Sequence, residues 1–394
     1  MKRLPFIIAL LSLHLLTGCW SSVELTERSF VGMMLLDKAE SGVELTLSFP
    51  LPNRLIPGFS GGNGQTAGKP YTYVTKTGRD IGEAYRSIQS DLSRKITFGQ
   101  TSVIVIGEQL AKEGIQSVLE FIAREPRFHI NASLFVVNGK ATELTTVPAV
   151  FERFPVDILL AYDRDHITID TTTNDCLKAS YYGGDMILPL LKFEKKGMPS
   201  EASAVKNWMG TDGAAIFKQG KLVATLNTNE MRGALWVRGQ LQDAEISVRS
   251  FTDGKNVNYM INRAKTKIHP VINGNQITVY VRTKAEASLI ACESNVNLQN
   301  RKEEKRLEEG IEALVEQRMS KAIASVRKAG SDAYQIGSYI DWYHPEAWKR
   351  ISQNWREIYA NQVHFITEAD ITINRIGSVN KPLMIHSPES EEAK

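Results

Sequence analysis

The feature that most constrains the fold is an alternation of strand and helix patterns along the first half of the 394-residue chain. Residues 43–49 alternate apolar and polar side chains, which indicates a half-buried strand. Residues 81–92 repeat apolar positions at helical spacing, and the β-branched run at 101–106 is typical of a strand buried on both faces. A helix at about 114–124 and a strand at 132–137 follow, and this order predicts α/β layers.

A loop and a linker divide this first region. The segment Gly58 to Pro70 is rich in Gly, Ser, Asn and Gln, and it predicts a flexible exposed loop. Further elements are expected at 71–75 as a strand, and at 151–160 and 173–180 as helices. Lys195 to Ser200 is a polar linker candidate. We therefore expect an N-terminal α/β region over 19–196, with a division into two subdomains left open.

The second half has a different pattern, in which strands come first and long helices follow. Asp253-Gly254 and Asn273-Gly274 are strong turn signals between strand-like segments. Apolar residues recur every three or four positions from Leu298 to Lys328, so we expect a long amphipathic helix there. The expected elements are a hairpin at 214–226, strands at 245–251, 258–267, 276–284 and 362–376, and helices at 298–328, 334–339 and 345–359. The pattern predicts an α+β domain over 206–378, built as an antiparallel sheet packed with long helices, and a polar tail over 379–394. The whole chain is thus a multi-domain protein of mixed α/β and α+β class.

The N-terminus has the pattern of a secretory signal peptide over residues 1–18. Lys2 and Arg3 precede a short apolar run that ends near Leu16, and the run is shorter than the roughly 20 residues that a membrane-spanning helix needs. The sequence from Leu16 to Cys19 resembles the lipobox of bacterial lipoproteins. This resemblance implies that Cys19 is acylated on its sulfur and becomes the first residue of the mature chain.

Composition limits the kinds of partner that this chain can have. It is 42% hydrophobic and 23% charged, which supports a sizeable core and argues against global disorder. The formal net charge is +3, and losing Lys2 and Arg3 with the signal leaves the mature chain near +1. That charge indicates neither nucleic acid nor strong attraction to anionic lipid, so membrane binding is expected to come from the lipid on Cys19. Cys176 and Cys292 remain, and we favour two unpaired thiols over a disulfide.

No motif in the sequence predicts catalysis, a metal or a cofactor. The histidines lack the spacing of a zinc helix, and Cys-x-x-Cys is absent from the sequence. Asp163, Asp165 and Asp170 lack the glycine and the terminal glutamate of a calcium loop, so a solvated turn is the better interpretation. The glycines from Gly58 to Gly68 precede Lys69-Pro70 rather than the helix that a phosphate cradle requires. We therefore expect a non-enzymatic binding or assembly protein.

The aromatic residues of the last third leave a second function open. Tyr339, Trp342 and Tyr343, with Trp348 and Trp355 beyond them, are the residues of a possible sugar- or partner-binding patch. At helical spacing beside a strand, such residues more often belong to a core. The patch motivates the alternative that the chain is a lipid-anchored extracytoplasmic solute- or glycan-binding protein.

Several segments in fixed order resemble the Ger(x)C-type lipoproteins, the C subunits of spore germinant receptors. The resemblance begins with Cys19-Trp20 and Val23-Glu24-Leu25, where Val23 replaces the usual arginine, and runs over almost the whole chain. Its other segments are Lys76-Thr77-Gly78, Phe98-Gly99-Gln100, Val103 to Glu108, Gly114-Ile115, Gly213 to Lys218, Lys221-Leu222-Val223, Glu230, Ser331 to Gly337, Trp348 and a closing strand that ends at Gly377.

This resemblance implies a function that the residues alone do not. Germinant receptors combine an A subunit and a polytopic B subunit in the spore inner membrane with a lipid-anchored C subunit, and small nutrients trigger them. We therefore expect a non-enzymatic receptor subunit on the outer face of the spore inner membrane, with A- and B-type subunits as partners and no nucleic acid. Cys19 is the only residue to which the resemblance assigns a role.

Overall fold

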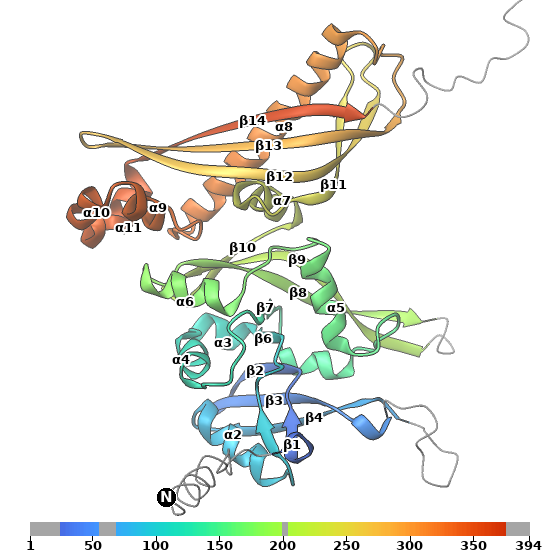
Figure 1. The fold of residues 1–394 in the computed structure, drawn as a ribbon, viewed down its shortest axis with the longest axis vertical. Coiled ribbons are helices and arrows are strands. Elements are labelled where there is room, and N and C mark those ends of the chain that lie inside the picture. The colour runs from blue at the N-terminus through green and yellow to red at the C-terminus, as the bar shows by residue number, and fades with distance from the viewer. Residues whose placement is uncertain (1–23, 55–67, 199–203, 376–394) are drawn as a thin grey trace, which may run out of the picture.

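The computed structural model describes residues 24–54, 68–198 and 204–375, whose strands form three sheets. The larger sheet lies in the lower half of Figure 1 and a four-stranded sheet in the upper half. A short parallel pair, β1 (Arg28–Phe30) with β5 (Lys95–Thr97), forms the third sheet. The predicted signal peptide, most of the predicted glycine-rich loop and the predicted polar tail lie outside the described residues.

The larger sheet has a parallel centre and antiparallel edges. Among the described residues its order is β10-β9-β8-β7-β6-β2-β3-β4, with β2, β6, β7 and β8 mutually parallel. Parallel neighbours need crossover connections, and helices provide them here. The strands are β2 (Met33–Ala39), β3 (Gly42–Pro50), β4 (Tyr71–Gly78), β6 (Val103–Gly107), β7 (Ser133–Val137), β8 (Met186–Met198), β9 (Ala204–Lys218) and β10 (Lys221–Leu226).

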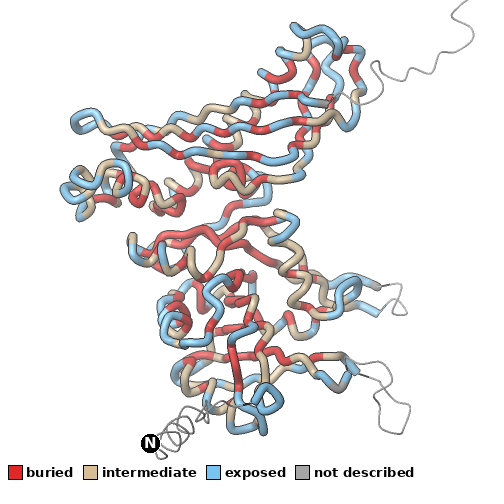
Figure 2. The backbone as a smooth tube through the Cα atoms, in the orientation of Figure 1, coloured by how far each residue is buried: buried red, intermediate tan, exposed pale blue. Residues whose placement is uncertain are grey.

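Helices cover both faces of this sheet, which explains the continuous apolar runs of its central strands. In β6, Ile104 and Ile106 join one buried cluster, whereas Val103 and Val105 join another on the opposite face. Figure 2 shows the resulting buried stretch through the middle of the sheet. The first cluster includes α2 (Ile81–Ser90), α3 (Glu108–Glu113), α4 (Gln116–Arg124) and α6 (Thr173–Tyr181); the second includes the 3-10 helix η3 (Ala141–Thr146) and α5 (Pro155–Arg164).

The smaller sheet has the order β11-β12-β13-β14 among the described residues, and one of its pairings differs from the expected antiparallel one. β11 (Gln242–Arg249), β12 (Asn256–Asn273) and β13 (Gln276–Cys292) are antiparallel, but β14 (Val363–Arg375) is parallel to β13. The long helix and those after it return the chain to the beginning of β13, so β14 runs in the same direction. Burial alternates along much of β12, which leaves one face of the sheet exposed.

The long helix α8 (Arg301–Lys328) confirms the expected amphipathic pattern. Leu307, Ile311, Val315 and Met319 are buried on the side that faces the sheet. The other helices of this half are α7 (Thr228–Arg238), α9 (Ile336–Tyr343), α10 (Pro345–Ile351) and α11 (Trp355–Asn361). The expected single helix over 345–359 is wrong, because a 3-10 turn (Ser352–Asn354) separates α10 from α11.

Glutamates of α8 also protect the edge strand β14. Three carboxylates, one helical turn apart, accept hydrogen bonds from alternate backbone N–H groups: Glu308 from Ile373 (3.0 Å), Glu312 from Ile371 (3.1 Å) and Glu316 from Ala369 (3.0 Å). An edge strand otherwise presents such groups to another chain. The spacing that buries one face of α8 thus also aligns a polar row with β14.

The mixed multi-domain fold class is confirmed, with two departures in detail. The linker candidate at Lys195–Ser200 is wrong in its described part, because β8 continues to Met198 and pairs there with Ala204 of β9. Helix α7 is the second departure, since no helix was expected over its residues. As β9 and β10 belong to the larger sheet, that sheet includes strands from both expected regions. The two expected regions, with boundaries at 19–196 and 206–378, therefore stay a proposal.

Candidate functional site

Cys19, the one residue to which sequence analysis assigned a role, lies outside the described residues. Its acylation therefore stays a prediction. Within residues 24–54, 68–198 and 204–375, no helix combines the length and the apolar character needed to cross a membrane. In these same ranges, no three His, Cys, Asp or Glu side chains gather in a way that would hold a metal ion.

The most developed polar site joins the two halves of the molecule. Asp185, between α6 and β8, is almost fully buried and makes a bidentate ion pair with Arg356 of α11, both N–O distances being 2.8 Å. Its carboxylate also accepts hydrogen bonds from the backbone N–H of Gln219 (2.9 Å) and of Asp332 (2.8 Å). One carboxylate thus ties together the beginning of β8, the β9–β10 turn and the segment after α8.

Asp332 continues this network inside the second half. It accepts hydrogen bonds from the backbone N–H groups of Ile336 and Gly337 and from the indole N–H of Trp355, each at 2.8 Å. Burial raises the pKa of Asp332 to about 7, and the neighbouring Asp185 adds to the rise. We call Asp185, Asp332 and Arg356 the junction cluster. The side chains of the cluster are engaged in these ion-pair and hydrogen-bond contacts, which hold the segments together.

The segment Ser331 to Gly337 forms the second half's side of this junction. Ser331 donates a hydrogen bond to the carbonyl of Phe217 in β9 (2.7 Å), and Gln335 donates one to the carbonyl of Asp185. Gly337 is required for packing, because a Cβ there would lie 2.7 Å from the Trp348 ring. Sequence analysis singled out this segment without a role. In the structure this segment contacts the larger sheet through Phe217 of β9 and Asp185.

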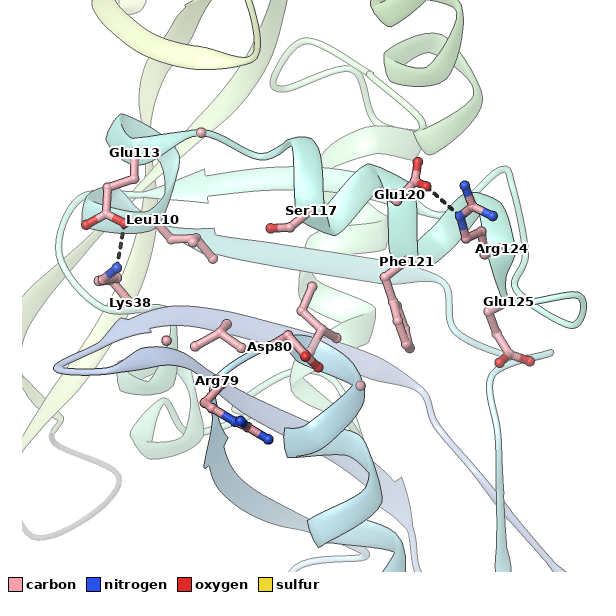
Figure 3. Close-up of a pocket in the computed structure, with 15 residues that line it drawn as sticks. Lys38, Arg79, Asp80, Leu110, Glu113, Ser117, Glu120, Phe121, Arg124 and Glu125 are labelled. Carbon is pink, nitrogen blue, oxygen red and sulfur yellow. Dashed lines mark hydrogen bonds and ion pairs between the residues drawn. The ribbon is translucent and has the colours of Figure 1, made fainter.

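A surface hollow of about 580 Å³ lies between the beginning of α2 and the helices α3 and α4 (Figure 3). Lys38 pairs with Glu113 at 2.7 Å and Arg124 pairs with Glu120, so much of its charge is neutralised within the chain. The Asp80 carboxylate caps α2 by accepting a hydrogen bond from the N–H of Glu83 (2.8 Å). These contacts give the charged residues of the hollow structural roles, as ion-pair partners and as a helix cap.

The remaining candidates from the sequence fall in separate places. Asp165 is exposed and pairs with Arg164, whereas burial raises the pKa of Asp163 to about 7 and also raises that of Asp170. Cys176 and Cys292 are both free thiols, the first buried within α6 and the second partly exposed at the end of β13.

The aromatic residues divide into two groups. Trp348 and Trp355 pack edge to face, with ring centroids 5.5 Å apart, and Trp355 is buried. Trp342 and Tyr343 are instead exposed, at 68% and 52%. The core interpretation is confirmed for Trp355, whereas Trp342 stands at the surface.

Sequence reasoning missed Asp185 and Arg356. They are 171 positions apart, and neither belongs to a local motif. A signal for their pairing would require information about contacts that a single sequence does not contain.

Comparisons with known proteins find spore germination proteins for both halves of the chain. A family described as "Spore germination protein N-terminal domain" matches residues 21–193, and one described as "Spore germination B3/ GerAC like, C-terminal" matches residues 212–377. Spore germination protein KC of Bacillus subtilis (strain 168) is 25% identical and covers 97% of this chain and 98% of its own length. Spore germination protein B3 of the same organism is 26% identical, and the match covers 95% of this chain and 98% of that protein.

Two further similarities extend this pattern. Spore germination protein GerQC of Bacillus cereus is 24% identical over 80% of this chain and 84% of its own length. The crystal structure of the GerBC protein has the same fold with a TM-score of 0.55 at 20% identity, covering 86% of this chain and 96% of that one. Because the two family descriptions match successive regions that together make up most of the sequence, this chain belongs to the GerAC-like family of spore germination proteins.

Proposed function

We propose that this chain is a lipid-anchored, non-enzymatic subunit of a nutrient germinant receptor, required for germination through assembly with membrane-embedded A- and B-type subunits. The observation that carries the proposal is the match of both germination-protein regions downstream of a leader that ends at Cys19. Its site of action is the outer face of the spore inner membrane.

The anchor supplies the physical basis of assembly. Two acyl chains hold a protein at a bilayer where one holds it only marginally. A tethered domain meets membrane partners at a high effective concentration, so even weak contacts suffice for a complex. A near-neutral mature chain supports the view that lipid rather than surface charge provides the attachment.

The charged groups of the junction support a role without catalysis. Asp185 and Arg356 neutralise each other, and Asp332 is occupied by three hydrogen-bond donors. Groups engaged in this way are poor nucleophiles and poor general bases, because a reaction would first have to break their contacts.

An exposed apolar patch on α5 and its surroundings is the surface that we assign to a membrane-embedded partner subunit. Phe151 is 90% exposed, and Val150 and Ile167 are exposed beside it along a shallow cavity of about 250 Å³ that also includes Trp208. Contiguous exposed apolar side chains mark protein interaction sites on soluble domains.

Two genetic tests examine this proposal. Deletion of the gene, in a strain that lacks similar genes, is expected to abolish germination with at least one nutrient while sporulation continues. Normal germination of the deletion spores with every nutrient would contradict it. Cys19→Ala is expected to abolish labelling of the chain by palmitate and to weaken germination without loss of the folded chain. Persistent labelling would refute the role of Cys19.

A further inference from the structure

A cavity of about 350 Å³ lies where the two halves meet, next to the junction cluster. Helix α6 and the beginning of β8 contribute one wall, and the end of α7, β12 and the α9 region contribute the other. The volume lies within the range of small-molecule sites.

The cavity contains a cation that lacks an ion-pair partner among the described residues. Arg238 donates hydrogen bonds to the hydroxyl of Thr171 and to the backbone carbonyl of Asp170, both at 3.2 Å, and both acceptors are uncharged. Burial lowers the pKa of Arg238, whereas the carboxylates of Asp175 and Asp170 act in the opposite direction. A guanidinium has five N–H groups arranged as a fork, so donors remain for an anion.

Besides Arg238, the lining contributes one cation and one carboxylate, and the Asp170 carboxylate outside the lining also interacts electrostatically with Arg238. Lys178 is exposed at the rim and adds a second cation. Asp175 adds one negative charge, but its carboxylate already accepts hydrogen bonds from the N–H (3.0 Å) and the hydroxyl (2.8 Å) of Thr172. The lining therefore contains two cations and one carboxylate that is already hydrogen-bonded to Thr172.

Aromatic and apolar side chains surround the cation. Tyr339 and Trp342 pack with ring centroids 5.5 Å apart, and Trp342 is largely exposed although it lines the cavity. Tyr334 is 5% exposed, and its hydroxyl has no hydrogen-bond partner among the described residues.

We propose that this cavity binds a small organic acid, with the carboxylate on Arg238 and an apolar or aromatic body against Tyr339 and Trp342. The proposal goes beyond the assembly role, because it gives this subunit a ligand of its own. Residues of both halves line the cavity, so the bound acid would connect them and stabilise the junction.

The experiment uses the full chain in detergent micelles and the acid 3-phenylpropionate as the probe. Its uncharged amide, 3-phenylpropanamide, has nearly the same shape and is the matched control ligand. Binding is followed through the indole N–H signals of the tryptophans in ¹H–¹⁵N spectra, in which Trp342→Phe identifies the signal of Trp342. The acid is expected to shift that signal saturably with a Kd on the order of 1 mM, and the amide to bind about tenfold more weakly.

Variants distinguish binding in the cavity from nonspecific partitioning of the probe into the detergent micelles. Trp342→Ala is expected to weaken binding measured by calorimetry, while Tyr343→Ala, the adjacent exposed aromatic outside the cavity, leaves binding unchanged. Arg238→Met is expected to remove the preference for the acid over the amide. If Arg238→Met does not fold, Lys178→Gln at the exposed rim is expected to reduce the same preference several-fold. The proposal would be overturned if acid and amide bound equally, or if no saturable shift occurred at probe concentrations far above that Kd. Either result would leave the assembly function untouched.

Discussion

Asp185→Ala removes the one carboxylate that joins three segments across the junction, and its cost can be worked out from the contacts. The side chain is 4% exposed and accepts hydrogen bonds from two backbone N–H groups and two guanidinium nitrogens. Loss of one partner of a buried ion pair costs about 3–5 kcal/mol, and each buried donor left without an acceptor costs about 1–3 kcal/mol. Arg356 is 35% exposed and can turn towards water, so we expect a loss of about 4 kcal/mol in the free energy of unfolding.

Urea unfolding followed by tryptophan fluorescence measures this loss. The matched control is Asp370→Ala, which breaks the 2.6 Å pair between Lys284 and a 59% exposed Asp370 on β14. Exposed pairs contribute little, so the control is expected to lose less than about 1 kcal/mol. A loss for Asp185→Ala no greater than that of Asp370→Ala would refute the reasoning that the junction depends on a buried charge.

The other predictions concern packing, the strand edge and pH. Gly233→Ala is expected to cost about 2 kcal/mol, because its Cβ would lie 2.3 Å from the carbonyl oxygen of Arg318 where α7 meets α8. Gly310→Ala, with open space around its Cβ, is expected to stabilise by about 0.5–1 kcal/mol, and thermal unfolding that ranks the two alike would contradict this account. Glu312→Ala removes the acceptor for the N–H of Ile371 and is expected to speed hydrogen exchange there; unchanged exchange would argue against edge protection. Burial raises the pKa of Asp163 from 3.8 to about 7, so the folded chain binds this proton more tightly and loses stability as pH rises from about 4 to 7. Asp163→Asn is therefore expected to flatten that slope and to gain roughly 2 kcal/mol at pH 8, after allowance for partial exposure; an unchanged profile from urea unfolding at each pH would count against it.

Periodicity made the most regular elements predictable. The run that became β6 has side chains buried on both faces, and the three- and four-residue spacing of α8 has one buried face. In both cases the pattern of apolar residues reflects burial directly. The glycine turn at Gly274 was predictable for a different reason, because a tight hairpin between β12 and β13 requires its positive φ of 60°.

Elements whose surroundings hide this pattern could not be predicted as easily. Helix α7 is buried on nearly all sides, so it lacks an amphipathic stripe. Its signals were instead the capping box between Asn227 and Glu230 and the left-handed Gly239 at its end. In β8, Pro189 and the lysines near its end obscured a strand that pairs with β9.

The junction and the cavity could not be predicted at all from local patterns. Asp185 and Arg356 meet only because the second half folds back on the first. Arg238 likewise belongs to no local motif, and only the fold brings it beside Tyr334 and Tyr339.

Purification of the membrane complex through this chain tests the central proposal most directly. Spore inner membranes are solubilised in mild detergent, the tagged chain is captured, and the companion proteins are identified by mass spectrometry. The account predicts that polytopic A- and B-type receptor subunits are recovered with the wild-type chain, and that Phe151→Asp at the exposed patch reduces their recovery. Recovery of the anchored chain without any receptor subunit would contradict it.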